Sequence, residues 1–225
     1  RTGSPVDAQP LVSATATKLA EVCEASDGTC PAEATAAPTV PPVVDPAGWL
    51  VPADLPRISA GKGQWNAQAP TDLTSKGMGC ENMVLASDPG PTARQQRTFV
   101  LQSDSNTPAG FGLDEMKFTF PDEATATTFQ ESLASNVASC TQRFSTAQVT
   151  EYTAVTGAGV SDLPVTARLF TVTVANSDTE KLTYQLAVAR AGATVTYVLT
   201  TVTPEYQFSE ASLGTIGLRA GARAT

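Results

Sequence analysis

The sequence predicts an α+β domain in which an antiparallel β-meander sheet is covered on one face by helices and stapled by a disulfide. Strand-like segments rich in Val, Thr and Tyr follow one another between residues 165 and 202, with only short turns between them. A helical segment at residues 122–143 interrupts the strands and carries Cys140 near its end. The cysteines are four, an even number. Consecutive strands joined by short turns pair antiparallel, and helices then cover the sheet.

The N-terminal part of the chain is expected to be an arm outside the domain. Residues 8–25 place apolar side chains at helical spacing. Residues 31–56 contain seven prolines, a composition typical of an extended linker. We therefore divide the chain into an N-terminal helix and Pro-rich linker at residues 1–44 and an α+β domain at residues 45–225.

The first elements of the domain are strands followed by one helix. Residues 98–102 have a strand pattern, and residues 115–120 alternate polar and apolar side chains, as in a strand with one buried face. Pro121 ends this strand, and Asp122 begins a helix. The apolar residues of that helix recur every three or four positions and share one face: Ala126, Phe129, Leu133, Val137 and Cys140.

The last elements are three strands and a helix. Residues 165–175 and 181–191 flank a polar turn, and residues 193–202 form a third strand after a second turn. Ser209 is expected to cap a final helix that runs to Arg219. A loop is expected at residues 157–159, whose glycines lack the spacing of a phosphate-binding motif.

Composition excludes several classes of function. The hydrophobic fraction is 41% and the charged fraction 16%, which favours a folded core. The net charge of −8 argues against binding to nucleic acid or to an anionic membrane surface. Arg94 and Arg97 are the nearest approach to a basic cluster, and we expect them at a solvated strand edge. The chain has no histidine, so the usual general base and the commonest metal ligand are missing.

The cysteines favour two disulfides over a metal site. Cys23 and Cys30 are close in sequence, whereas Cys80 and Cys140 are far apart, and neither spacing is that of a zinc site. Three pairings are possible, of which we favour Cys23–Cys30 and Cys80–Cys140. The alternative is four free thiols in a cytosolic protein. Neither a metal nor another cofactor is predicted.

No run of 18 apolar residues exists, and the chain begins at Arg1 without a signal-peptide pattern. We interpret it as part of an exported protein whose signal or membrane anchor lies outside this sequence. Association with the membrane would then occur only through that anchor.

A ligand site cannot be assigned from a motif, because no catalytic triad, nucleophile elbow or phosphate loop is present. A sheet partly covered by helices can leave an apolar groove that binds a small or lipidic molecule or a peptide. The candidate lining is aromatic, although each of these side chains could instead belong to the core: Trp65, Phe111, Tyr152, Tyr184 and Tyr197. We place the cleft near Tyr184 and Tyr197, closed by the helix of Phe129 and Leu133.

The strand–Phe-Pro-acidic–helix–Cys unit at residues 118–140 and the Leu-Pro element before Trp65 carry a family resemblance. Together with the late meander and terminal helix, they resemble the actinobacterial extracellular sensor domains, exemplified by that of the mycobacterial Ser/Thr kinase PknH and by related lipoproteins. The resemblance covers roughly residues 48–220. It implies a disulfide-stapled α+β fold with a cleft, a ligand-sensing role and no catalysis. Val137 stands where the family commonly has Trp, and the Cys23/Cys30 arm has no clear counterpart.

Three hypotheses about function follow. The first is a non-catalytic extracytoplasmic sensor or ligand-binding domain, tethered to the membrane at the cell surface or in the cell envelope. The second is a cell-envelope lipoprotein or scaffold that binds a protein partner. The third is a histidine-free hydrolase, which would need clustered carboxylates with raised pKa values in one cleft.

Overall fold

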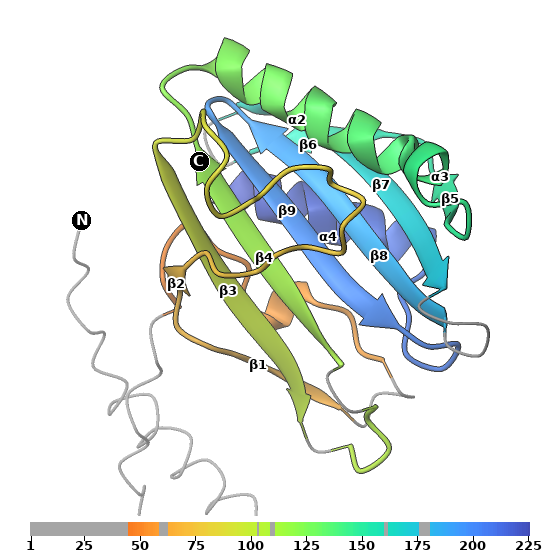
Figure 1. The fold of residues 1–225 in the computed structure, drawn as a ribbon. Helices are drawn as coiled ribbons and strands as arrows, with labels where there is room; N and C mark the ends of the chain where they lie inside the picture. The colour runs from red at the N-terminus through yellow and green to blue at the C-terminus, as the bar shows by residue number, and fades with distance from the viewer. Residues whose placement is uncertain (1–44, 59–62, 103, 109–110, 160–161, 176–180) are drawn as a thin grey trace, which may run out of the picture. The chain divides into compact units, whose positions relative to one another are not determined.

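A computed structural model describes residues 45–58, 63–102, 104–108, 111–159, 162–175 and 181–225. These residues belong to a compact unit that spans Asp45–Thr225. In the described residues, nine antiparallel strands form one sheet in the order β1-β3-β4-β9-β8-β7-β5, with β2 beside β3 and β6 beside β7 (Figure 1). The strands are β1 (Gln64–Ala67), β2 (Thr71–Asp72), β3 (Ala93–Gln102), β4 (Gly112–Thr119), β5 (Gln148–Glu151), β6 (Val155–Ala158), β7 (Pro164–Ala175), β8 (Lys181–Ala191) and β9 (Thr194–Val202). The α+β class and the antiparallel sheet are therefore confirmed.

The meander forms the long-stranded half of the sheet. β7 pairs with β8 and β8 with β9, the second pair joined by a tight turn at Gly192. Gly192 has a φ of +52°, a left-handed conformation that glycine adopts readily. The chain crosses from β4 to the far edge strand β5, and the meander then returns so that β9 pairs with β4. The predicted loop at residues 157–159 is largely strand, because β6 continues to Ala158.

Helices cover both faces of the sheet, so the prediction that they cover one face is wrong. Helix α2 (Glu123–Ala138) lies on one face and helix α4 (Glu210–Arg223) on the other (Figure 1). The central strands are apolar on both sides for this reason. On β8, Leu186 and Val188 belong to the core under α2, whereas Ala187 and Ala189 belong to the core under α4.

The predicted helix at residues 122–143 is present as two pieces. Asp122 caps α2 by accepting a 2.8 Å hydrogen bond from the Thr125 backbone N–H, and this bond lowers the pKa of the Asp122 carboxyl. Helix α2 ends at Ala138, and the short helix α3 (Cys140–Arg143) follows. Cys140 forms the expected disulfide with Cys80, with their Cα atoms 5.1 Å apart. The disulfide ties α3 to the loop between β2 and β3.

Helix α4 begins where the sequence predicts. The Ser209 side chain accepts a 3.2 Å hydrogen bond from the Ser212 backbone N–H, and the helix continues past Arg219 to Arg223. Gln185 of β8 fixes the approach to α4, because its amide pairs at 2.8 Å with both the N–H and the carbonyl of Phe208. Cys23, Cys30, the expected first helix and the turn between β7 and β8 lie outside the described residues, and the predicted boundary at residue 45 stays a prediction.

Candidate functional site

Residues 45–58, which we call the strap, run along the α4 face of the sheet. The only regular element of the strap is the single helical turn η1 (Pro52–Asp54). A segment without a strand partner must satisfy its buried backbone groups in another way. In this protein, charged side chains of β3, β4 and α4 bind the strap along its length.

A cross-strand pair holds the middle of the strap. Arg97 and Glu115 lie opposite each other on β3 and β4. The Arg97 Nη1 donates a 2.5 Å hydrogen bond to the Leu50 carbonyl, and Glu115 Oε2 accepts a 2.9 Å bond from the Leu50 N–H. Arg97 also pairs with Asp45 through a 2.6 Å contact and is only 2% exposed. The expectation that Arg97 lies at a solvated edge is therefore wrong.

Glu115 is a fully buried carboxyl group under the strap. Burial raises its pKa to about 8, against the lowering effects of the Leu50 hydrogen bond and of the charges on Lys117 and Arg97. Its Oε1 has no hydrogen-bond partner within the described part of the chain. The strap therefore covers a carboxyl group whose uncharged form is favoured by burial.

Lys117 holds the strap next to this pair. Its Nζ lies 4.2 Å from the centre of the Trp49 ring and donates a 3.3 Å hydrogen bond to the Gly48 carbonyl. Burial lowers the pKa of Lys117, and the nearby Glu115 charge opposes that effect. The Trp49 side chain is almost fully buried in this arrangement, where the strap lies over the sheet.

Helix α4 holds the far end of the strap through Asp54. The Asp54 carboxylate is chelated by Arg223, with Nε 2.5 Å from Oδ2 and Nη2 3.1 Å from Oδ1. It also accepts a 2.9 Å hydrogen bond from the Val51 N–H. Arg219 donates a 2.9 Å hydrogen bond to the Asp54 backbone carbonyl and stands 3.9 Å from the carboxylate. One aspartate is thus held by two arginines of α4.

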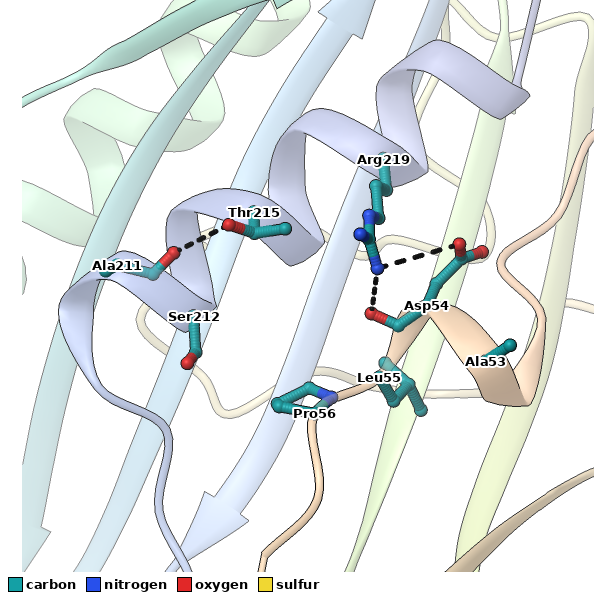
Figure 2. Close-up of a pocket in the computed structure, with 8 residues that line it drawn as sticks. All are labelled: Ala53, Asp54, Leu55, Pro56, Ala211, Ser212, Thr215 and Arg219. Atoms are coloured by element: carbon teal, nitrogen blue, oxygen red, sulfur yellow. Dashed lines mark hydrogen bonds and ion pairs between the residues drawn. The ribbon is translucent and has the colours of Figure 1, made fainter.

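Between α4 and this end of the strap lies a pocket of about 370 Å³, which we call the α4 groove (Figure 2). Its lining is Ala53, Asp54, Leu55 and Pro56 from the strap and Ala211, Ser212, Thr215 and Arg219 from α4. Figure 2 shows the Arg219 side chain extending from α4 toward the strap, with its guanidinium beside Asp54. The groove therefore combines an apolar strap wall, two hydroxyl groups and a cation, which suits a small ligand with a polar end.

A second pocket, of about 490 Å³, lies beside the start of α2. We call it the α2 pocket; it is lined by Pro89, Gly90, Phe120, Ala124, Thr125, Thr128, Phe129 and Ser132. The Phe129 ring lies 5.0 Å from the rings of both Phe118 and Phe120, so the aromatic side chains contact one another. No charged side chain lines this pocket. It could therefore recognise a ligand only through its shape and its apolar surface.

The five aromatic residues predicted to line a cleft are divided between the two faces of the sheet. Tyr184 and Tyr197 belong to the α2 face, and Trp65, Phe111 and Tyr152 to the α4 face. They do not line one groove.

At the place predicted for the cleft, Tyr197 and Leu133 are both fully buried, whereas Phe129 lines the α2 pocket. The Tyr197 hydroxyl donates a 2.6 Å hydrogen bond to Glu81 Oε1, which raises the pKa of Tyr197 further beyond the effect of burial.

The aromatic residues on the α4 face have structural partners. The Trp65 indole N–H donates a 2.9 Å hydrogen bond to the Pro56 carbonyl, and its ring lies 5.8 Å from that of Phe111. The Tyr152 hydroxyl lies 3.0 Å from the Thr171 hydroxyl. Trp65 is therefore the predicted residue with a direct connection to the α4 groove, since Pro56 forms part of its wall.

Sequence reasoning missed the charged residues that build this region. One signal was present: Arg97 shares the two-residue period of Phe99 and Leu101, which places it on the buried face of β3. Glu115 shares the period of Leu113 in the same way on β4. No comparable signal marked Arg219, because its role depends on the position of the strap.

No known protein family matches the sequence, and no curated protein shows significant similarity to it. None of the helices in the described residues has both the length and the hydrophobicity needed to cross a membrane. Within the same residues, no group of three or more Cys, Asp and Glu side chains is arranged to hold a metal ion.

Proposed function

We propose that this chain contains a non-catalytic, extracytoplasmic ligand-binding domain of the sensor type, and that the α4 groove is its ligand site. The observation that carries the proposal is that the two walls of the groove belong to different parts of the fold. One wall is α4, which packs on the sheet, and the other is the strap. A ligand in the groove contacts both and so favours the docked strap.

The strap is suited to respond to a ligand. It pairs with no strand, and its attachment relies on Arg97, Glu115, Lys117 and the Asp54 contacts. The buried side chains of Leu50, Leu55 and Ile58 add to these contacts, but the strap has no ladder of strand hydrogen bonds, so we expect it to open at lower free energy than the strands of the sheet. The strap also directly follows residues 1–44 in the sequence.

Two further observations support the extracytoplasmic location. The Cys80–Cys140 disulfide is consistent with an oxidising compartment. The sequence also resembles extracellular sensor domains that are tethered to the membrane. On this proposal, an anchor outside the sequence holds the domain at the cell surface or in the cell envelope.

The test is a ligand screen on the full chain and on two matched variants. Thermal-shift and NMR measurements with small metabolites, cell-wall fragments and lipids should reveal compounds that stabilise the protein. Ala53 lines the α4 groove and is exposed, so Ala53→Trp should fill the groove and abolish that binding. Ser135→Trp, on the exposed side of α2, is the control for a new surface tryptophan and should leave binding unchanged.

Two other outcomes would favour a different site or a different function. If Ser132→Trp abolishes binding and Ala53→Trp does not, the ligand occupies the α2 pocket and the proposed site is wrong. If no compound stabilises the chain but a cell-envelope protein co-purifies with it, the function is that of a protein-binding scaffold.

A further inference from the structure

We infer that the α4 groove recognises a small monocarboxylic acid, whose carboxylate is bound by Arg219 and whose short apolar part lies against Leu55 and Pro56. This inference rests on the proposed function and specifies the class of ligand for the same site. Four features of the groove lead to it: the local charge, the free edge of a guanidinium, the nature of the opposite wall, and the size of the pocket.

The local charge leaves one cation without a full partner. Asp54 is the only acidic residue that lines the groove, and Arg223 chelates its carboxylate through two contacts. Arg219 stands 3.9 Å from the same carboxylate, beyond hydrogen-bond distance. The three side chains together carry one net positive charge, in a protein whose net charge is −8. An anion in the groove would restore local neutrality.

The Arg219 guanidinium is already oriented. Its Nη1 donates to the Asp54 backbone carbonyl, which holds the group at the groove wall (Figure 2). The Nε and Nη2 atoms donate to no described residue, and the side chain is 49% exposed. These two N–H groups form the edge on which arginine binds a carboxylate through paired hydrogen bonds. Ordering by the strap reduces the conformational entropy lost on binding.

The rest of the lining selects a short apolar body. Leu55 and Pro56 form the strap wall opposite α4, and Ala53 and Ala211 add only methyl groups. The Thr215 hydroxyl donates to the Ala211 carbonyl at 2.9 Å, and the Ser212 hydroxyl lies 2.9 Å from that of Ser209. Both hydroxyls keep acceptor capacity for a donor on the ligand. The groove lies near the lower end of the size range of small-molecule sites, which favours a compact acid.

The single net positive charge of the groove favours a carboxylate ligand over a phosphate monoester. A carboxylate carries one negative charge and matches the one excess cation. A phosphate monoester carries close to two charges at neutral pH and would bring the second toward Asp54. The inferred order of affinity is therefore carboxylate, then phosphate monoester, then the neutral amide of the same shape.

The test is an NMR titration of the isotope-labelled full chain with isovalerate and benzoate, their amides isovaleramide and benzamide, and phenyl phosphate. The acids should shift the Arg219 Nε–H signal and the backbone signals of Ala211, Ser212 and Thr215. Arg219→Gln should weaken the acids about tenfold or more, while Arg219→Lys should retain part of the affinity. Arg168→Gln removes a half-buried arginine of β7 that pairs with Glu151 and should leave the affinity unchanged.

The outcomes distinguish failure of the proposed ligand site from failure of the inferred ligand class. If the amides bind as tightly as the acids and Ala53→Trp blocks both, the groove is a ligand site but the inferred acid is wrong. If phenyl phosphate binds tighter than benzoate, the ligand class is a phosphate ester instead. If the acids leave the groove signals unchanged while an unrelated compound is blocked by Ala53→Trp, the inference also fails and the proposed site stands. If nothing is blocked by Ala53→Trp, both fail.

Discussion

Gly221 of α4 lies directly against Val165 of β7: a β-carbon added to Gly221 would be 2.5 Å from the Val165 Cγ1 atom. The same helix face carries Gly214 and Gly217, and it packs over the small side chains of Ala167, Ala187 and Ala189. The absence of a side chain at these three glycines allows α4 to approach the sheet closely. The α4 groove depends on that approach, because α4 supplies one of its walls.

Gly221→Ala should destabilise the protein. Val165 is almost fully buried and branched at its β-carbon, so it has little room to move away from a new methyl group. The strain should cost about 1–3 kcal/mol, more than the roughly 1 kcal/mol that alanine adds in helix propensity. Gly214→Ala is the matched control, because its new β-carbon would meet neighbours at an ordinary 3.4 Å. Urea unfolding should give a lower midpoint for Gly221→Ala only; equal midpoints would show that α4 can shift freely.

Glu115 should make stability depend on pH. Its pKa is raised from an ordinary 4.5 to about 8 in the folded state, so between these values the folded protein binds more protons than the unfolded chain. The free energy of unfolding must then fall as pH rises from about 4.5 to 8, by about 1.4 kcal/mol for each unit of pKa shift at most. Glu115→Gln should flatten this slope, because an amide does not titrate.

The measurement is the free energy of unfolding at a series of pH values across that window. Glu115→Gln retains an oxygen that can accept the Leu50 N–H, so the strap contact is kept. Glu131→Gln, a substitution at an exposed position of α2, should show the same dependence of unfolding free energy on pH as the wild-type protein. A slope that is the same with and without the Glu115 carboxyl would contradict the assignment.

Reduction of Cys80–Cys140 should lower stability by roughly 2–5 kcal/mol, because the bond closes a long loop, with a sequence separation of 60. Non-reducing peptide mapping of the native protein should recover these two cysteines linked to each other. Cys80→Ala combined with Cys140→Ala should reproduce the stability of the reduced protein, which separates the loss of the bond from any effect of the reductant. Recovery of alkylated Cys80 and Cys140 from native protein would contradict this pairing.

Tyr197→Phe should destabilise the α2 face by about 1–3 kcal/mol, because it removes a donor from the buried Glu81 carboxylate. Tyr184→Phe is the control: Tyr184 is only partly buried, and its hydroxyl donates to no described residue. A double-mutant cycle with Glu81→Gln measures the coupling directly. A coupling energy near zero would mean that the Tyr197 hydroxyl is satisfied in another way.

The local elements were predictable because their signals are local. Asp122 and Ser209 are cap residues, and each begins a helix. The alternation of Met116 and Phe118 with polar residues correctly marked a strand, but not its second buried face, which carries Leu113 and Glu115. The position of Cys140 on the apolar side of its helix likewise indicated the disulfide that the structure contains.

The arrangement of the layers was not predictable in the same way. Leu186 and Val188 alternate with Ala187 and Ala189, so both faces of β8 are apolar, and the pattern does not say which helix covers which face. Even the polar side chains of Thr196 and Thr200 on β9 are buried.

The candidate site was less predictable still. Arg97 and Leu50 are 47 residues apart in sequence, and Arg219 and Asp54 are 165 apart. Contacts of this range depend on where the strap crosses the sheet, and no local pattern encodes that position. The aromatic residues were chosen for their chemistry alone, and Tyr197 shows why that choice fails: a buried ring with a satisfied hydroxyl has the same sequence signal as a ligand platform.

The hydrogen bonds of Arg97 and Glu115 to the Leu50 backbone affect how the domain responds to a pulling force. A pull applied to the chain before residue 45 loads the Asp45–Arg97 ion pair first, then the Gly48–Lys117 contact, then the two bonds to Leu50. These bonds are met one after another, so the strap peels from the sheet in steps and no pair of strands has to separate. Peeling also exposes the buried side chains of Trp49, Leu50 and Leu55, so hydrophobic burial resists each step while the sheet itself can stay intact.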